Sequence, residues 1–368
     1  MSQSERDLRW MREALRLAQL GTGATYPNPC VGAVVVKRGR VVGKARSDVT
    51  GGDHAEVRAL AEAGRAAKGA TVYLTLEPCA HRGRTPPCAD ALVAAEVARV
   101  VAAIEDPASH TAGAGLRRLA QAGIEVELGV LAERAREVHR HYLHHVAHGR
   151  PFVTLKLAVS VDGRIATAGG DSKWITGEPA RRSAHRLRAR HHGIAVGAAT
   201  VLADDPRLDV RLVAGVDPLP VVFDPRLRVA SAGRPFNLLR PGVLYLHTAR
   251  ASKRARRALR EAGAEGLELP AASSGGVDID AALAQLGARE LRSMMVEGGG
   301  RLVGAFVGAG AWQELWLYRA PVVLGEGRPA IAGVGWATVA DAPHLEVVRR
   351  RKLGVDDLCV YAPVGDPT

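Results

Sequence analysis

Residues 75–88 read Thr75-Leu76-Glu77-Pro78-Cys79-Ala80-His81-Arg82-Gly83-Arg84-Thr85-Pro86-Pro87-Cys88, and an earlier triplet reads His54-Ala55-Glu56. The apolar run before Cys79 predicts a short strand, and a polar loop leads from its end to Cys88. His54, Cys79 and Cys88 provide three N/S donors, the donor set of a catalytic zinc site whose fourth position stays open for water. Zinc lowers the pKa of such a water toward about 7. Glu56, two residues after His54, is placed to act as acid and base.

The order His-x-Glu followed by Pro-Cys is typical of zinc deaminases that act on an amino group of a pyrimidine or purine ring. Their second Cys usually follows the first after two residues, whereas residues 80–87 separate Cys79 from Cys88 here. The run Gly83-Arg84-Thr85-Pro86-Pro87 before Cys88 resembles one family in particular, the bifunctional deaminase/reductase of riboflavin biosynthesis. In that family the second ligand Cys follows a Gly-Arg/Lys-Thr-Pro-Pro run.

Length and composition favour a globular protein of two domains. The chain has 368 residues, of which 47% are hydrophobic, enough for a core in each domain. We find no apolar stretch of the roughly 20 residues needed to span a bilayer, and residues 1–7 lack the layout of a signal peptide. We therefore expect a cytoplasmic protein with no membrane partner.

The net charge of +12 fits either nucleic acid or small anionic ligands. Aromatic residues make up only 4% of the chain, so stacking platforms for single strands are scarce. We favour phosphorylated small molecules and expect no nucleic-acid partner. The four cysteines fit a reducing compartment, because Cys79 and Cys88 belong to the zinc pattern. We interpret Cys359 as core packing, and Cys30 as a small packed side chain rather than a zinc ligand.

Helices and strands alternate through the first half, which indicates a three-layer α/β domain. We predict helices at 5–20, 54–67, 114–122 and 130–149 and after Cys88, and strands at 31–37, 40–44, 70–76, 98–104 and 124–128. The last helix carries His139, His141, His144, His145 and His148, which we interpret as a solvated face rather than a metal site. Gly149-Arg150-Pro151 ends it, giving domains 1–149 and 150–368.

The second half also alternates strands and helices. We predict strands at 152–158, 194–197, 219–224, 243–247, 293–297, 314–319 and 359–361, and helices at 178–190, 251–262, 279–286 and 299–307. Residues 263–277 are interpreted as a surface connection. The run Glu297-Gly298-Gly299-Gly300-Arg301 lies between a strand and a helix, where backbone amides could bind phosphate, but a tight turn explains it equally well.

Several motifs of the second half resemble, in order, those of the reductase domain of the same bifunctional family. They are Lys156-Leu157-Ala158, Ser160-Val161-Asp162-Gly163-Arg164, 172–177, 203–208 and Glu297-Gly298-Gly299. The resemblance covers residues 5–362. It implies a cytidine-deaminase-like domain followed by a dihydrofolate-reductase-like α/β domain that uses NADPH. Members of the family are often homo-oligomers, so the resemblance allows one here.

The resemblance also implies site residues. In the first half they are the zinc ligands His54, Cys79 and Cys88, the proton shuttle Glu56, Asn28 for the pyrimidine and Arg84 for the substrate phosphate. In the second half, NADPH is assigned to Ala158, Trp174, Thr200, Asp204, Gly299, Gly300, Arg301, Leu302, Val303, Gly304 and Ala305. The phosphoribosyl substrate is assigned to Ser172, Arg188, Leu208, Arg211 and Glu297.

Some positions depart from the family pattern. Ser47 and Ala108 replace a frequent His and Asn near the first site, while Asp209 and Pro225 replace a usual Thr and Ser in the second half. The implied function is zinc-dependent deamination of 2,5-diamino-6-(5-phosphoribosylamino)pyrimidin-4-one, followed by NADPH-dependent reduction of its ribosyl side chain to ribityl. One alternative is a paralogue with another aminopyrimidine substrate or an inactive deaminase half. The other is an RNA-binding base deaminase or a non-catalytic nucleic-acid binder.

Overall fold

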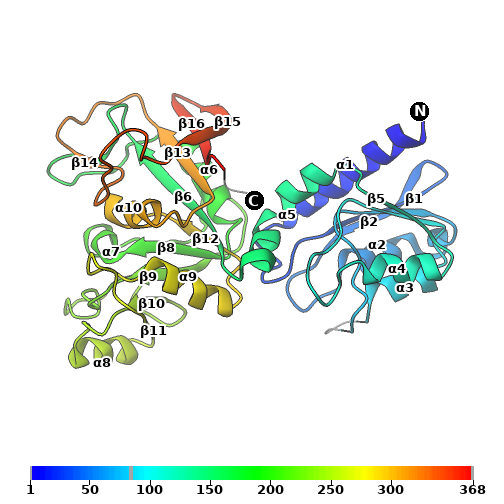
Figure 1. Cartoon of the computed structure of the whole chain (residues 1–368), viewed down its shortest axis with the longest axis horizontal. Coiled ribbons are helices and arrows are strands. Elements are labelled where there is room, and N and C mark those ends of the chain that lie inside the picture. The colour runs from blue at the N-terminus through cyan, green and yellow to red at the C-terminus, as the bar shows by residue number, and fades with distance from the viewer. Residues whose placement is uncertain (1, 83–85, 366–368) are drawn as a thin grey trace. The chain divides into compact units, whose positions relative to one another are not determined.

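The computed structural model describes residues 2–82 and 86–365, and the chain divides into two compact units, Met1–His148 and Gly149–Thr368 (Figure 1). Each unit has its own sheet and hydrophobic core. No helix among the described residues combines the length and apolar content that a membrane crossing requires.

The first unit is a five-stranded sheet between two groups of helices. Its elements are α1 (Gln3–Gly21), β1 (Gly32–Lys37), β2 (Arg40–Arg46), α2 (Ala55–Ala63), the 3-10 helix η1 (Gly64–Ala67), β3 (Thr71–Leu74), α3 (Cys88–Ala94), β4 (Arg99–Ala102), α4 (Ala114–Gln121), β5 (Glu125–Leu128) and α5 (Ala132–His148). The strand order is β2-β1-β3-β4-β5, antiparallel around β1 and parallel from β3 to β5. Figure 1 shows α1 and α5 on one side of the sheet and α2, α3 and α4 on the other.

Close packing joins the first helix to the sheet. A Cβ on Gly32 of β1 would lie 1.9 Å from the Ala14 carbonyl oxygen of α1, so only glycine allows this approach. The central strands are apolar and buried, as expected for parallel strands covered on both faces. The predicted α/β domain is confirmed, because helices and strands follow one another as the pattern indicated.

The second unit is built on a nine-stranded sheet. Its elements are β6 (Phe152–Val159), β7 (Arg164–Ala166), α6 (Glu178–Arg188), β8 (Gly193–Gly197), α7 (Ala198–Asp204), β9 (Leu219–Phe223), β10 (Leu244–His247), α8 (Lys253–Glu261), β11 (Glu265–Glu268), α9 (Ile279–Ala288), β12 (Ser293–Val296), α10 (Gly300–Gly308), β13 (Glu314–Arg319), β14 (Arg328–Pro329), β15 (Leu345–Leu353) and β16 (Asp356–Pro363). The order is β11-β10-β9-β8-β12-β6-β13-β16-β15. The strands are parallel from β11 to β13, and β16 and β15 are added antiparallel.

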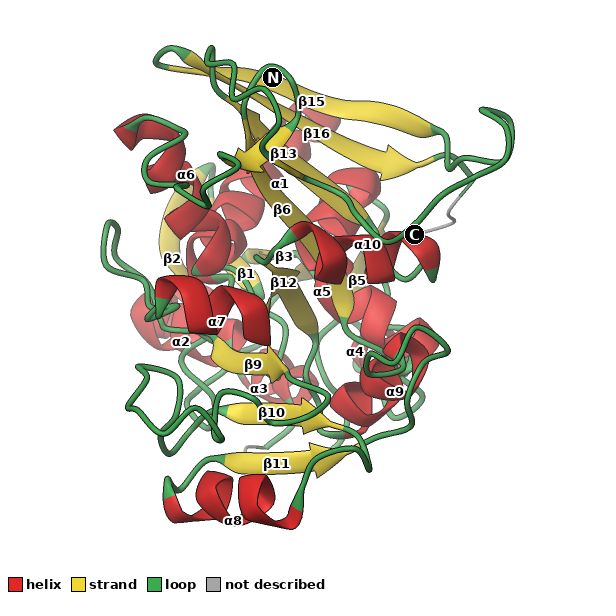
Figure 2. Cartoon of the chain, turned by 90° about the vertical axis from the view of Figure 1, so that its left-hand side faces the viewer, coloured by secondary structure: helices red, strands yellow, loops and turns green. Residues whose placement is uncertain are grey.

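Two edge strands correct the sequence prediction. β11 lies within 263–277, which we had interpreted as a surface connection, and Figure 2 shows it beside β10 with α8 next to it. β15 was not predicted. Its residues are mostly exposed and include a basic run at 349–352, so an inward-facing apolar pattern is missing at this edge.

The histidines of α5 are a second correction. His139, His141 and His145 are buried, whereas we had interpreted this face as solvated. The helix turns the face inward, where the His139 ring lies 3.1 Å from the Thr75 hydroxyl and the His141 ring 2.8 Å from the Tyr26 hydroxyl. Histidine has an apolar ring with polar edges, so both environments are compatible with its sequence pattern.

Candidate metal centre and reductase site

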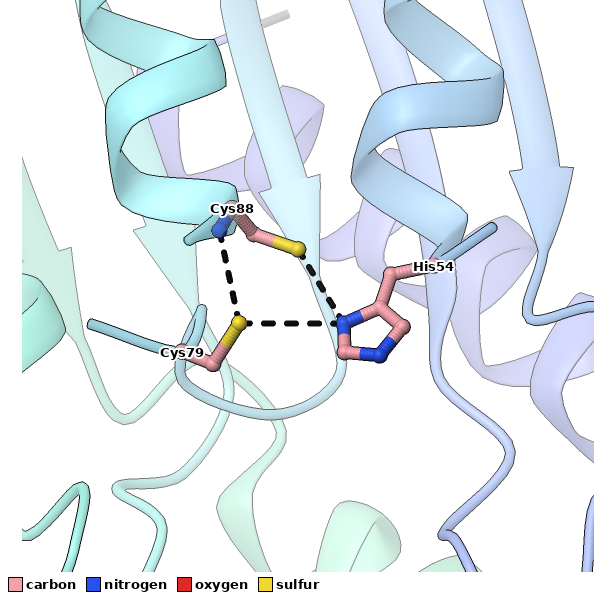
Figure 3. A group of neighbouring side chains, drawn as sticks. All are labelled: His54, Cys79 and Cys88. Atoms are coloured by element: carbon pink, nitrogen blue, oxygen red, sulfur yellow. Dashed lines mark hydrogen bonds between the residues drawn. The ribbon is translucent and has the colours of Figure 1, made fainter. Parts of the chain in front are cut away.

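Three donor atoms from separate segments meet in the first unit. The ring and sulfur atoms of His54, Cys79 and Cys88 all lie within 4.8 Å of one another (Figure 3). His54 Nδ1 is 3.2 Å from Cys88 Sγ and 3.7 Å from Cys79 Sγ. The group is the one that could hold a metal ion among residues 2–82 and 86–365.

Local structure explains why these side chains converge. His54 is the N-cap of α2, and Cys88 is the first residue of α3. Cys79 follows the end of β3, and the Cys88 backbone amide donates to its sulfur over 3.3 Å. The positive ends of two helices therefore face the site and favour thiolates.

The protonation states within the group are tightly linked. Hydrogen bonding with Cys88, and then with His54, lowers the pKa of Cys79, although burial opposes the change. The bond to Cys79 and burial raise the pKa of Cys88, and the bond to Cys79 also raises the pKa of His54. Zinc binds thiolates and neutral imidazole, so metal binding would release the protons shared in this group.

Glu56 lies in the first turn of α2 and is only 2% exposed. Burial raises the pKa of its carboxyl to about 7, in the range useful for acid–base chemistry at neutral pH. Its Oε2 atom is buried without a hydrogen-bond partner among the described residues, which is costly unless a ligand completes the site. Two sulfurs, an imidazole and this buried carboxylate fit a catalytic zinc.

Glu77 is a residue whose role the sequence did not reveal. Its buried carboxylate accepts hydrogen bonds from the backbone amides of Asp106, Gly113 and Gly115 at 3.1, 2.9 and 2.8 Å, and from a fourth amide at 3.4 Å. It thereby ties the segment after β4, and the start of α4, to the loop that carries Cys79. Backbone amides leave no residue pattern, so no sequence signal identified these partners.

The structure places the other predicted residues of the first site on neighbouring loops. Asn28 is exposed, in the loop between α1 and β1. Ser47 Oγ accepts a 3.0 Å hydrogen bond from the Val31 amide, and Ala108 is buried. Cys30 is buried, and burial raises the pKa of its thiol to about 11. Arg84 lies outside the described residues.

A second charged cluster lies in the second unit. Glu297, just after β12, pairs through Oε1 with Lys156 Nζ at 2.8 Å and through Oε2 with Arg188 Nη2 at 2.7 Å. Burial alone would raise the pKa of Glu297, but Arg188 and Lys156 outweigh it and lower the pKa. The structure thus joins Arg188 and Glu297, both predicted for the substrate, with a lysine that had no assigned role.

Two of the residues predicted for NADPH, Thr200 and Gly299, lie at the starts of α7 and α10. Gly299 is the N-cap of α10, and its amide donates to the Thr200 hydroxyl of α7 over 3.2 Å. Trp174 is 65% exposed, with the Arg181 guanidinium 4.7 Å from its ring centroid. Ala158 is on β6 and Asp204 ends α7, while Arg301, Leu302 and Ala305 are at least partly accessible on α10.

Part of the predicted cofactor run faces protein instead. Val303 is fully buried. A Cβ on Gly300 would meet the Pro329 carbonyl oxygen at 2.4 Å, and one on Gly304 the Ala332 carbonyl oxygen at 2.0 Å. These positions pack α10 against the segment that contains β14.

The remaining substrate residues differ in accessibility. Leu208 is buried, Ser172 is half-buried and Arg211 is exposed. Asp209 pairs with Arg207 at 2.8 Å and with Arg211 at 2.6 Å. Arg211, predicted to bind the phosphoribosyl substrate, is therefore already paired with a carboxylate. That carboxylate belongs to Asp209, which replaces the Thr that is usual in the family pattern.

Comparisons with known proteins match both units. The family described as cytidine and deoxycytidylate deaminase zinc-binding region matches residues 4–104, and the RibD C-terminal domain matches residues 151–358. The riboflavin biosynthesis protein RibD of Bacillus amyloliquefaciens is 41% identical over 352 residues, covering 94% of each chain. RibD of Escherichia coli is 41% identical over 368 residues, covering 96% of this chain and 98% of its own.

Solved structures are similar over almost the whole chain. RibD of Acinetobacter baumannii has a TM-score of 0.86 and 35% identity, covering 98% of this chain and 100% of its own. A diaminohydroxyphosphoribosylaminopyrimidine deaminase/5-amino-6-(5-phosphoribosylamino)uracil reductase from Thermotoga maritima also has a TM-score of 0.86, with 30% identity and the same coverage. The similarity therefore extends through both units.

Proposed function

Because this chain belongs to the RibD family of bifunctional deaminases and reductases in riboflavin biosynthesis, we propose that its two units act in turn on one phosphorylated aminopyrimidine. The chain is an enzyme with a zinc-binding deaminase unit and a reductase unit. The proposed first substrate is 2,5-diamino-6-(5-phosphoribosylamino)pyrimidin-4-one. The second is its deaminated product, whose ribosyl group is reduced to ribityl.

In the first reaction, His54, Cys79 and Cys88 would hold zinc, and Glu56 would move the protons. When bound, zinc supplies a Lewis acid that makes hydroxide available near neutral pH. The buried carboxyl of Glu56 has a pKa of about 7, so it can accept a proton and deliver it to the leaving amino group. The observation that carries this assignment is the convergence of the three donors beside a carboxylate oxygen that has no partner among the described residues. Asn28 is proposed to orient the pyrimidine, and Arg84 to bind the phosphate.

In the second reaction, we assign NADPH to the region of Ala158, Trp174, Thr200, Asp204 and the start of α10. The amide groups at a helix start suit phosphate oxygens. When bound, the cofactor supplies the hydride. Glu297, held by Lys156 and Arg188, would accept hydrogen bonds from sugar hydroxyls and so orient the ribosyl chain. Ser172, Leu208 and Arg211 complete the proposed substrate contacts.

A coupled assay tests both assignments in the full chain. Purified protein receives zinc, the diaminopyrimidinone phosphate and NADPH, and ammonia release and NADPH oxidation are followed separately. Wild-type protein should give both signals. Glu56→Gln should lose ammonia release and still oxidise NADPH when given pre-deaminated substrate, while Glu62→Gln on the exposed face of α2 should retain both activities.

If wild-type protein oxidises NADPH only when it is given pre-deaminated substrate, and releases no ammonia, the deaminase assignment is contradicted. That result would also favour the paralogue alternative, with Ser47 and Ala108 as the positions to restore. Absence of both signals would contradict the proposed substrates.

A further inference from the structure

Three side chains, spread over nearly half the circumference of α5, form a polar face that bonds to three separate segments of the deaminase unit. His141 Nδ1 lies 2.8 Å from the Tyr26 hydroxyl. The Tyr142 hydroxyl donates to Asp106 Oδ1 over 2.8 Å. His139 Nε2 lies 3.1 Å from Thr75 Oγ1. None of the three was assigned a role in either reaction.

The Tyr26 segment connects this face to the first zinc ligand. Thr50 Oγ1 donates to the Thr25 carbonyl over 2.9 Å and also bonds the Tyr26 carbonyl. Thr50 precedes His54 by one short loop, and the Tyr26 loop also carries Asn28. A shift of the Tyr26 ring would therefore move the proposed pyrimidine contact.

The other two bonds lead to the loop that carries Cys79. Thr75 Oγ1 accepts a 3.0 Å hydrogen bond from the Gly32 amide at the start of β1, and Thr75 lies just beyond the end of β3. The Asp106 backbone amide donates a hydrogen bond to Glu77 Oε2 over 3.1 Å, and Glu77 precedes Cys79 by two residues. The polar face of α5 thus contacts segments that lead to two of the three zinc ligands.

We propose that His141 is a positioning residue for deamination, which sets the loop bearing Asn28 through its bond to Tyr26, with Tyr142 and His139 fixing the opposite segments. The inference rests on the proposed deaminase function. Within this loop Thr25 holds the Asn28 backbone, because its carbonyl accepts from the Asn28 amide over 2.9 Å and its hydroxyl donates to the Asn28 carbonyl over 3.0 Å. The turn therefore holds together as a unit, and the bond from His141 to Tyr26 fixes that unit against α5. Apolar side chains would anchor a helix without the cost of burying polar groups, yet this face uses two imidazoles and a phenol.

A double-mutant cycle tests the bond between His141 and Tyr26. His141→Phe and Tyr26→Phe each remove one hydrogen-bonding partner while keeping a ring in place. We expect each to raise KM for ammonia release about fivefold to tenfold, because one lost hydrogen bond has that effect, and to leave kcat within about twofold. The double variant should have the KM of a single variant.

Several matched measurements separate positioning from general structure. His141→Asn can keep a bond to Tyr26 and should restore most of the wild-type KM. His148→Phe, at an exposed site on the same helix, should leave KM unchanged. Zinc content and NADPH oxidation with pre-deaminated substrate should match wild type in every variant. His141→Phe and Tyr26→Phe should lower Tm modestly and to a similar extent, because each removes the same buried hydrogen bond.

The inference is overturned by effects that add in the double variant, or by a KM that stays at the wild-type value. If the conservative Tyr26→Phe variant loses zinc, or if its Tm and kcat both fall sharply, these residues only stabilise the fold and do not position the substrate. A wild-type chain that releases no ammonia would instead contradict the proposed function on which the inference depends.

Discussion

The two sites treat a carboxylate held away from bulk water in opposite ways, since Glu56 is buried and Glu297 is half-buried. Glu56 is buried, and one of its oxygens has no hydrogen-bond partner among the described residues. It belongs to the site where His54, Cys79 and Cys88 could hold a metal ion. Glu297 has both oxygens in ion pairs, with Lys156 and Arg188. The pKa of the first is raised and that of the second is lowered. The first arrangement suits a site that takes up a metal ion, whereas in the second the charge of Glu297 is already neutralised by neighbouring side chains.

Removing zinc should break this contrast most completely. A chelator should abolish ammonia release, because the ligands alone do not activate water, and it should leave NADPH oxidation with pre-deaminated substrate unchanged. Metal content and both activities, followed during chelation and zinc restoration, provide the measurement. Loss of both activities together would show that the reductase site also depends on the metal.

Glu56→Gln should have the next largest effect. A general acid–base group contributes about 10²- to 10⁴-fold to rate, so kcat for ammonia release should fall by that range. Zinc content should stay near one ion per chain, since Glu56 is not among the proposed ligands His54, Cys79 and Cys88. A variant that keeps wild-type kcat would remove Glu56 from the mechanism.

Glu297→Gln should lower kcat/KM for reduction by about 10- to 100-fold and leave deamination unchanged. The substitution leaves Arg188, whose side chain is 8% exposed, and Lys156 without their carboxylate. Arg188 is then left without its countercharge in a mostly buried position, so the second unit should unfold at a lower denaturant concentration. Glu290→Gln, which removes the charge of an exposed carboxylate paired with Arg292, is the control. Equal losses in both reactions would indicate a general defect.

The smallest effect is a pH dependence of stability in the first unit. Burial lowers the pKa of His139 from 6.5 to about 4. Between pH 4 and 6.5, His139 is therefore protonated in the unfolded chain and neutral in the folded chain. The contribution of the neutral ring to folding stability is fully present above pH 6.5 and is lost as the pH falls toward 4. His139→Asn should remove about 2 kcal/mol of the stability difference between pH 7 and pH 5. Denaturant titrations of both proteins at the two pH values measure this, and identical pH profiles would contradict a buried neutral ring.

The same contrast explains which site the sequence predicted more completely. The four residues of the predicted zinc site lie between positions 54 and 88, and their types and order predict a zinc deaminase without knowledge of the fold. They are His54, Glu56, Cys79 and Cys88. Lys156 is in β6 and Glu297 directly follows β12, and only the pairing of these two strands in the sheet brings them together. The α/β class and the alternation of elements followed from hydrophobic patterning, because the central strands of both sheets are buried. The cytidine-deaminase-like and dihydrofolate-reductase-like folds were implied by the family resemblance.

What the sequence did not predict has specific physical reasons. Glu77 binds backbone amides, which every residue carries, so its partners are invisible in a pattern of side chains. The buried face of α5 was misjudged because histidine is compatible with water and with a polar interior. β11 and β15 lie at sheet edges, where one side of the strand faces solvent and the apolar alternation is weak.

Gly115 has no side chain, yet its close packing helps to fix the loop that carries the proposed zinc ligand Cys79. A Cβ at this position would lie 1.9 Å from the Pro78 carbonyl oxygen, one residue before the ligand Cys79. Any other amino acid at position 115 must push α4 away from the ligand loop. The range of substitutions that this enzyme tolerates is therefore narrower than its list of chemically active residues suggests, and loss of zinc affinity can arise from a mutation that touches neither a donor atom nor a substrate.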